Sequence, residues 1–322
     1  MSQAPADNAR MARSPVQILE VAAHQEQQRL DNYLVARLKG VPKSLIYRII
    51  RKGEVRVNGK RCKADYRVQL HDKVRVPPLQ LAAATAPVRP GESLSALLRA
   101  AVLYEDEHLL VLNKPAGLPV HAGSGVKLGL IEALRFLHPE WPGLELVHRL
   151  DKGTSGCLVL AKTGPARRSL MQAFRERQVH KVYHALVGGK WPAALTTVDQ
   201  PLSREPERSG ERRVNVDPDG KPARTEFRVL ETFRHFTLIE AKPLTGRTHQ
   251  IRVHAAVAGH PLVGDDKYNP VAVPLPQGAR KQLCLHAAAV EFAHPHDGRR
   301  LRCAAPLDAS FSALLARLRS AD

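Results

Sequence analysis

The chain has 322 residues, 43% of them hydrophobic, which is enough to bury the cores of more than one domain. Its 49 basic and 31 acidic residues give a net charge of +18, which favours a polyanionic partner such as nucleic acid. The sequence lacks an apolar run of about 18 residues that could cross a bilayer, an apolar signal segment near its start, and any Cys-x-x-Cys pair among its four cysteines. We therefore expect a soluble, cytoplasmic protein without membrane contact, structural disulfides or a zinc site.

Residues 16–78 are predicted to form a small α/β domain of two helices and a hairpin, after residues 1–15, which we expect to be disordered. Each helix has one apolar stripe, formed by Leu30, Leu34 and Leu38 and then by Ile46, Ile49 and Ile50. Gly40 is expected to end the first helix, Ser44 to cap the second and Gly53 to close it. Strand-like residues at 55–57 and 68–70 flank Asn58-Gly59, a strong hairpin signal.

This small domain is strongly basic. Residues 41–75 carry eleven Lys or Arg and three acidic residues, a net charge of +8. Such a run is often only a solvated face, but opposite charges are usually interspersed on a merely soluble surface, so we favour RNA contact. The segment resembles the S4 RNA-binding domain through R-L-D-x-x-L at 29–34, Ser44 and G-E-V-R-V-N-G at 53–59. We expect an RNA-binding face formed by Arg29, Lys43, Ser44, Arg48, Arg51, Lys52 and Arg56.

A second, larger domain is predicted over residues 101–322, after an alanine-rich linker at 79–100. Strand-like runs occur at 109–112, 158–161, 182–187, 225–230, 236–241 and 283–292, and helical runs near 128–138, 165–178 and 248–258. Because strands often follow strands directly, we expect an α+β fold with a mixed, mainly antiparallel sheet rather than a doubly wound parallel one. Glycine-rich loops of the Walker or Rossmann type are absent, so nucleotide hydrolysis and hydride transfer lose their usual signatures.

The sequence H-R-L-D-K-G-T-S-G at 148–156 sets Asp151 among cations, hydroxyls and glycines. An arbitrary aspartate in such a segment is usually a turn residue or a salt-bridge partner. A carboxylate can also attack a sugar carbon, and it does so best when a fixed cation keeps it ionised and aimed. Arg149 and Lys152 are near Asp151 in sequence, and Arg247 is a candidate cation near it in space.

Five sequence blocks of the larger domain resemble the RluA family of RNA pseudouridine synthases. They are N-K-P-A-G at 113–117 with Val120-His121, H-R-L-D at 148–151 with T-S-G at 154–156, K-V-Y at 181–183, G-R-T-H-Q-I-R-V-H at 246–254, and L-H-A at 285–287. The resemblance implies the pseudouridine synthase fold and a reaction without cofactor or metal. That reaction breaks the bond from uracil N1 to ribose C1′ and joins uracil C5 to the same carbon.

The same resemblance implies roles for individual residues. Asp151 would be the essential carboxylate, acting as nucleophile or base toward the sugar. Tyr183 would stack on the uracil and help remove the C5 proton, and Arg247 would pair with Asp151 and hold open the gap left by a flipped nucleotide. Arg149 would contact RNA. The implied substrate is 23S ribosomal RNA, at irregular single-stranded or loop uridines where flipping costs least, and we expect a monomer.

Taken singly, these residues have plainer interpretations. Tyr183 lies in an apolar strand pattern typical of a core aromatic, and Arg247 could be one more phosphate contact. Lys114 could be a catalytic amine, but we favour an exposed loop lysine near RNA. Asp31 also follows Arg-Leu, yet it lies on a predicted helix without Thr-Ser-Gly after it, where an ion-pair or capping role suffices. Metal-ligand spacing is absent from His148, His249, His254 and His286.

Two other classes of function stay open. A non-enzymatic RNA-binding protein of ribosome assembly would explain the charge, but it would leave Asp151, Tyr183 and Arg247 without a joint purpose. A glycosidase or RNA base hydrolase would need a second carboxylate about 5–9.5 Å from the first. No second acid stands out in the blocks.

Overall fold

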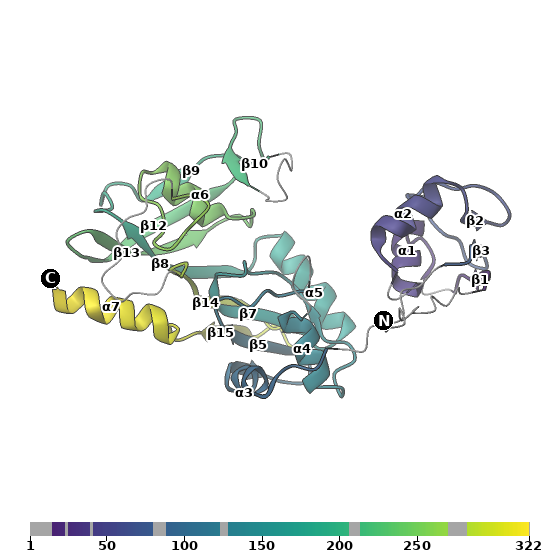
Figure 1. Cartoon of the computed structure of the whole chain (residues 1–322), viewed down its shortest axis with the longest axis horizontal. Helices are drawn as coiled ribbons and strands as arrows, with labels where there is room; N and C mark the ends of the chain where they lie inside the picture. Colours follow the sequence, from purple (N-terminus) through teal and green to yellow (C-terminus); the bar gives the residue numbers. More distant parts are fainter. Residues whose placement is uncertain are drawn as a thin grey trace, which may run out of the picture. The chain divides into compact units, whose positions relative to one another are not determined.

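The structure is a computed structural model, and it describes residues 15–22, 25–38, 41–79, 88–122, 128–205, 213–269 and 282–321 (Figure 1). The chain divides into two compact units, Met1–Pro87 and Val88–Asp322. The segment predicted to be disordered lies outside the described residues except for Pro15, and so does Gly40.

The N-terminal unit packs two helices with a three-stranded antiparallel sheet. Helices α1 (Leu30–Arg37) and α2 (Lys43–Arg51) bury both apolar stripes that the sequence predicts. The sheet has the strand order β1 (Gln17–Glu20), β3 (Lys73–Val76), β2 (Arg56–Val57). Gly53 follows α2 with φ of +71°, a conformation that favours glycine and stops the helix. The predicted helices and the stop at Gly53 are therefore confirmed.

Two local predictions for this unit are wrong. The strand that pairs with β2 is β3, not residues 68–70. Asp72 accepts hydrogen bonds from the Gln69 backbone N–H and from the Asn58 side chain, so residues 69–72 turn before the strand begins. Ser44 does not cap α2, because Pro42 occupies the N-cap position and Ser44 lies inside the first turn.

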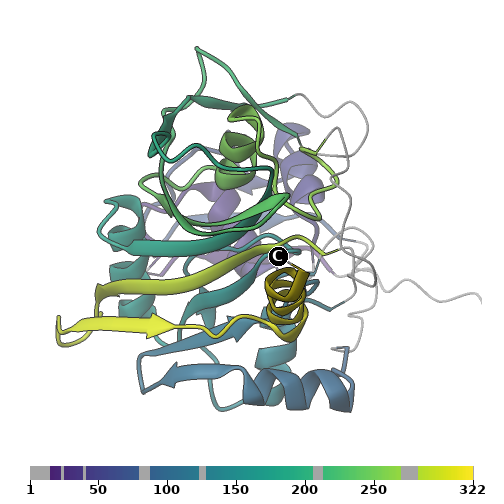
Figure 2. The same cartoon turned by 90° about the vertical axis from the view of Figure 1, so that its left-hand side faces the viewer.

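The second unit is built on one ten-stranded sheet, whose strands lie side by side in Figures 1 and 2. The strand order is β4 (Val102–Glu105), β5 (Leu109–Lys114), β7 (Ser155–Ala161), β14 (Leu285–Ala293), β8 (His180–Gly188), β13 (Phe236–Pro243), β12 (Arg224–Thr232) and β9 (Thr197–Asp199), with β6 (Glu145–Leu146) beside β7 and β15 (Arg300–Ala304) beside β14. Strands β7 and β14 pair in parallel, and the other neighbours pair antiparallel. The predicted mixed, mainly antiparallel sheet and α+β class are confirmed. Strands β10 (Leu202–Arg204) and β11 (Val214–Val216) form a small separate sheet.

Five helices accompany this sheet among the described residues: α3 (Glu92–Ala100), α4 (Leu130–Leu137), α5 (Gly164–Arg175), α6 (Gln250–Val257) and α7 (Ala309–Ala321). Helix α3 lies inside the range 79–100 that the sequence predicts as a linker. Its Leu98 is 1% exposed in the apolar core around β5 and β7. Two helical turns in an alanine-rich segment repeat the apolar period too few times to be recognised, so tertiary packing reveals the helix.

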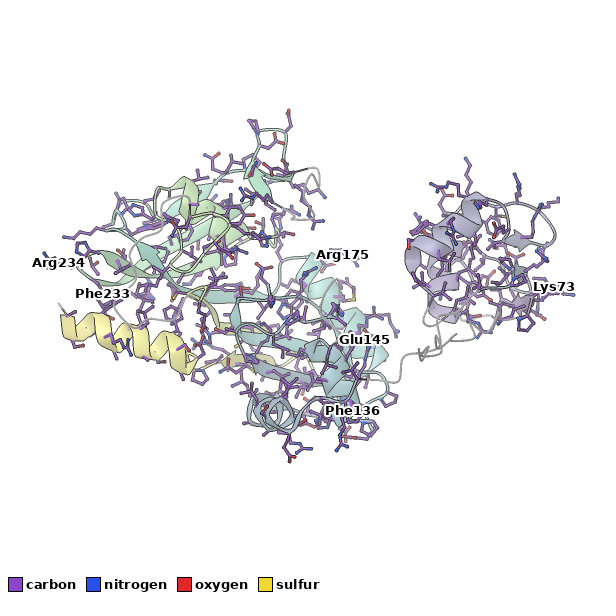
Figure 3. All side chains as sticks on the ribbon, viewed as in Figure 1. Lys73, Phe136, Glu145, Arg175, Phe233 and Arg234 are labelled. Carbon is purple, nitrogen blue, oxygen red and sulfur yellow. The ribbon has the colours of Figure 1, made fainter. Side chains whose placement is uncertain are left out.

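The C-terminal helix completes the core beyond β8. Phe311 and Leu315 of α7 pack in one cluster with Leu186 of β8 and with Phe233, which Figure 3 labels beside the helix. This cluster is separate from the apolar core around β5 and β7.

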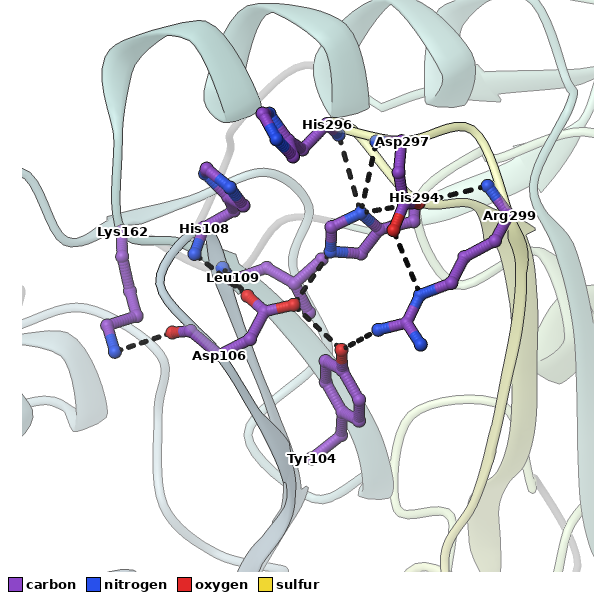
Figure 4. Close-up of polar contacts among 9 residues, drawn as sticks. All are labelled: Tyr104, Asp106, His108, Leu109, Lys162, His294, His296, Asp297 and Arg299. Carbon is purple, nitrogen blue, oxygen red and sulfur yellow. Dashed lines mark hydrogen bonds and ion pairs between the residues drawn. The ribbon is translucent and has the colours of Figure 1, made fainter.

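A polar cluster ties the β4–β5 turn to the end of β14 (Figure 4). The Asp106 carboxylate accepts hydrogen bonds from the His108 and Leu109 backbone N–H groups at 2.8 and 2.9 Å. It also accepts one from the Tyr104 hydroxyl and contacts His294 Nε2, both at 2.7 Å. A turn and a hairpin that are 188 residues apart in sequence are therefore joined through one carboxylate.

Candidate active site

A cavity of about 460 Å³ opens between the segment before β7, the end of α5, strand β8 and the turn that leads into α6. The predicted residues Arg149, Asp151, Tyr183 and Arg247 all line it. The other charged or titratable residues that line the cavity are His148, Arg175, Arg177, Lys181, Arg204, His249 and Arg252. Segments that are a hundred residues apart in sequence thus meet around Asp151, the one acidic residue among the lining residues described.

The loop that carries Asp151 is held by hydrogen bonds that the N-K-P-A-G block donates to the Lys152 carbonyl oxygen. Lys114 is fully buried, and its Nζ donates to the carbonyl oxygens of Pro115, Leu118 and Lys152 at 2.8, 2.8 and 3.3 Å. The Gly117 N–H donates to the same Lys152 oxygen at 2.8 Å. The favoured interpretation of Lys114 as an exposed loop lysine is therefore wrong: its amine joins two motif loops from inside.

Gly156 is required by close backbone contact. Its φ is +102°, and a Cβ atom at this position would lie 2.3 Å from the Ala287 carbonyl oxygen of the neighbouring strand β14. The glycine that ends the T-S-G sequence therefore lets β7 start against β14 immediately after the Asp151 loop.

Arg252, not Arg247, is the arginine that approaches Asp151. Arg252 Nη1 and His249 Nε2 each lie 3.6 Å from Asp151 Oδ2. Arg247 Nε instead donates to the Pro222 carbonyl oxygen at 3.1 Å. The predicted pairing of Arg247 with Asp151 is thus not formed here, although Arg247 lines the same cavity.

Arg252 is fixed by a second carboxylate that the sequence analysis missed. Its Nε and Nη2 donate to the two oxygens of Asp265 at 2.7 and 2.8 Å, and the Asp265 side chain has no exposed area. Burial acts to raise the pKa of Asp265, but the hydrogen bonds and charge of Arg252 lower it overall, so the pair stays ionised. Arg252 lies within the G-R-T-H-Q-I-R-V-H block, whereas no recognised block contains Asp265.

His249 is the second group at Asp151 that the sequence analysis left without a role. It is the N-cap residue immediately before α6, with φ of +54°, and its Nδ1 lies 2.8 Å from the Tyr268 hydroxyl. Burial lowers the pKa of His249, while the charge of Asp151 acts in the opposite direction. The imidazole is therefore mainly neutral near pH 7, which leaves Arg252 as the permanent positive charge beside Asp151.

Tyr183 presents a protonated phenol to the cavity. Burial, followed by the negative charge of Asp151, raises the pKa of Tyr183 well above its ordinary value. A phenolate, which direct removal of a C5 proton would require, is therefore disfavoured. The ring remains available for stacking on a base.

The predicted RNA-binding residues of the N-terminal unit have different surroundings. Arg48, Arg51, Lys52 and Ser44 are exposed, Arg56 is half-buried, and the side chain of Lys43 lies outside the described part. Arg29 instead donates two hydrogen bonds to Asp31, which is 2% exposed and also accepts one from the Tyr47 hydroxyl at 2.9 Å. The Asp31 carboxylate is thus an internal partner within its own unit, and much of the charge of Arg29 is balanced.

Within the described residues, no group of three His, Cys, Asp or Glu side chains is arranged to hold a metal ion. The four cysteines are free. The described helices include none that is long and apolar enough to cross a membrane.

Comparison with known proteins identifies both units. Residues 28–74 match the S4 domain, and residues 108–257 match the RNA pseudouridylate synthase family. The chain is 49% identical over 311 residues to ribosomal large subunit pseudouridine synthase C of Salmonella typhimurium, covering 95% of this chain and 98% of that protein. The protein of the same name from Escherichia coli K12 is 48% identical over 311 residues, again covering 95% and 98%.

Solved structures show the same architecture. Human RNA pseudouridylate synthase domain containing 4 matches with a TM-score of 0.58 and 30% identity, over 70% of this chain and 96% of that chain. Human RNA pseudouridylate synthase domain containing 1 matches with a TM-score of 0.55 and 28% identity, over 72% and 98%. The chain therefore belongs to the RluA family of RNA pseudouridine synthases, which are isomerases, and carries an S4 domain in its N-terminal unit.

Proposed function

We propose that this enzyme converts specific uridines of 23S ribosomal RNA to pseudouridine, with Asp151 as the essential carboxylate and without a cofactor. The proposal rests on one observation. Asp151 is the one acidic residue among the described residues that line the cavity, and it lies beside Arg252, while the other lining residues are cations or neutral groups. Asp265, the other acid that Arg252 contacts, has no exposed side-chain area and is engaged by Arg252, so it is unavailable as the second carboxylate of a glycosidase. The names of the large-subunit relatives support ribosomal RNA as the substrate.

The reaction needs no redox partner. Asp151 acts at the sugar, and the electron pair of the N1–C1′ bond leaves with the uracil, which becomes an anion. The detached base turns, its C5 forms the new bond to C1′, the C5 proton is lost and N1 gains a proton. Arg252 lies beside the carboxylate and aims it at the sugar, and the carboxylate is regenerated at the end of each turnover.

The N-terminal unit would supply affinity for the RNA. Arg48, Arg51 and Lys52 form an exposed basic surface on and just after α2 that suits phosphate contacts. Arg149 and Arg247 would contact the strand around a flipped uridine, with Tyr183 stacked on its base. We propose a monomer acting in the cytoplasm, where its four free cysteines stay reduced.

The decisive experiment compares wild type with Asp151→Asn on 23S ribosomal RNA transcripts. We expect wild type to produce pseudouridine without loss of base, and the variant to bind RNA with unchanged affinity but to produce none. Product in the variant would refute the role of Asp151. Released uracil would identify a hydrolase, and RNA binding without any product from wild type would indicate a non-enzymatic protein.

A further inference from the structure

Lys181 lines the cavity, and the proposed reaction gives its positive charge no role. It lies two residues before Tyr183 on β8, so both side chains leave the strand on the same face, and both line the cavity. The residue is partly buried, unlike the exposed Arg149 and Arg175 of the same cavity. Figure 3 labels Arg175 at the end of α5.

The Lys181 ammonium has unused donors. Among the described residues its one hydrogen-bond partner is the Thr245 carbonyl oxygen at 3.5 Å, the long limit of a hydrogen bond. An ammonium carries three N–H donors, and no carboxylate of the described residues lies within 4 Å of this one. A partly buried cation without a counter-ion is costly unless a ligand completes its coordination.

The titratable group His148 near Lys181 is neutral. Burial, with the nearby Lys181 charge as a smaller cause, lowers the pKa of His148 to about 3, so this imidazole is uncharged. His148 Nε2 accepts a hydrogen bond from the Val159 N–H at 2.9 Å, and the ring stacks on Phe174 with centroids 4.5 Å apart. Lys181 therefore carries its positive charge at a partly buried position beside an uncharged imidazole, and a charge acts more strongly on a ligand there than in open water.

We propose that the Lys181 ammonium donates a hydrogen bond to a carbonyl oxygen of the target uracil and stabilises the negative charge that the base acquires when its bond to C1′ breaks. This rests on the proposed function, in which the base stacks on Tyr183. When the N1–C1′ electron pair leaves with the uracil, the charge spreads to O2 and O4. Because Lys181 lies two residues from Tyr183 on the same face of β8, its ammonium can reach the edge of a base that stacks on the Tyr183 ring. The exposed arginines of the cavity are better suited to contact phosphates.

The interaction strengthens as the bond breaks, because the oxygens gain charge while the ammonium keeps its own. It therefore favours the transition state over the bound substrate, which raises the rate of the chemical step more than the affinity for RNA. Burial also lowers the pKa of Lys181 to about 8, so the free enzyme loses this donor as pH rises through that value.

The first test compares Lys181→Met with Lys190→Met, a matched change at an exposed lysine beyond the other end of β8. We expect Lys181→Met to slow single-turnover pseudouridine formation by about 100-fold, as when one preorganised donor is lost, while RNA affinity and its salt dependence stay within twofold of wild type. Lys190→Met should match wild type. Thermal unfolding checks that both variants are folded.

Two results of this test would overturn the proposal. An unchanged rate in Lys181→Met would remove any chemical role for the amine. A weaker RNA affinity with a flatter salt dependence and an unchanged rate would make Lys181 a phosphate contact. Both leave wild type active, so they are distinct from a failure of the proposed function, in which wild type itself makes no pseudouridine.

The second test uses RNA with 2-thiouridine or 4-thiouridine at the target position, because sulfur is a weaker hydrogen-bond acceptor than oxygen. We expect one of the two to slow wild type and to have no further effect on Lys181→Met, the non-additivity of two groups that share one contact. Lys181→Arg should keep activity and lose the fall in kcat/KM above about pH 8, since guanidinium stays charged. Thio effects of equal size in wild type and Lys181→Met would contradict the assignment.

Discussion

Arg252 joins Asp151 to a second, buried carboxylate. Its Nη1 lies 3.6 Å from Asp151 Oδ2, while its Nε and Nη2 hold Asp265 at 2.7 and 2.8 Å. Asp265, which is buried away from the cavity, therefore fixes the guanidinium. The remaining Nη1 edge of the guanidinium faces Asp151, which lines the cavity. Only arginine can contact both carboxylates in this way, because its planar guanidinium has donors in fixed positions on two edges and a lysine ammonium does not.

We predict that Arg252→Lys slows pseudouridine formation by about 100-fold or more and leaves RNA affinity near wild type. The ammonium can satisfy Asp265 or Asp151 but cannot hold both in this geometry. Single-turnover rates and filter binding measure the two effects separately. Arg247→Lys is the matched comparison, and we expect it to retain most of the rate. If Arg247→Lys lost the rate and Arg252→Lys kept it, the pairing derived from the sequence would be right and the one in the structure would not be used.

Asp265→Asn should reduce both the rate and the stability. The amide keeps the shape but loses the charge that faces Arg252, and one broken partner in a buried ion pair costs about 3 kcal/mol of the free energy of unfolding. The adjacent Asp266→Asn removes the same charge from an exposed side chain and should behave as wild type. Denaturant unfolding and single-turnover rates of the two variants check this. Equal behaviour of the pair would show that Asp265 does not position Arg252.

The motif residues were predictable because short segments carry them. The sequence blocks bring Asp151, Tyr183 and the segment 246–254 into one cavity, as expected from the family resemblance. The particular partner of Asp151 was not predictable, because Arg247 and Arg252 lie in the same block. The choice between them depends on where the left-handed turn at His249 ends and α6 begins.

Residues outside any motif were missed for a related reason. Asp265 contacts Arg252 only because the loop after α6 folds back on that helix, and nothing in its local sequence marks an aspartate as buried. Lys114 shows the opposite error. A lysine before a proline is typical of an exposed loop, yet three carbonyl oxygens accept hydrogen bonds from Lys114 Nζ and offset the cost of burying its charge. Tertiary hydrogen bonds, not local pattern, decide both cases.

RNA binding should lose salt dependence when the exposed arginines of α2 are removed. Each phosphate contact contributes about 0.7 to 0.9 to the slope of log affinity against log salt, so the double variant Arg48→Gln, Arg51→Gln should lower the slope by about 1.4 to 1.8. The control is Arg228→Gln with Arg319→Gln, two arginines already paired with Glu240 and Glu231. An unchanged slope in the α2 variant would exclude this face from phosphate contact.

The Asp106 cluster of Figure 4 should make stability depend on pH below the usual range for carboxylates. Burial acts to raise the pKa of Asp106, but hydrogen bonds from Tyr104, two backbone N–H groups and His294 lower it far below its ordinary value. The folded state therefore favours the ionised form. The resulting stabilisation is fully present above the unfolded pKa of about 3.9 and is lost as pH falls through the lower folded pKa.

Asp106→Asn removes this titration and weakens the contact with His294, so we expect a loss of about 1–3 kcal/mol in the free energy of unfolding at pH 7. The difference from wild type should shrink as pH falls below about 4, because the unfolded wild-type chain then takes up a proton at Asp106 that the folded state resists, which lowers wild-type stability. Urea unfolding at pH 7, 5, 4 and 3 measures the difference, with Asp219→Asn as an exposed control that should show no change. A difference that stays constant across these pH values would mean that packing of the turn, rather than the charge of Asp106, joins β4 and β5 to the end of β14.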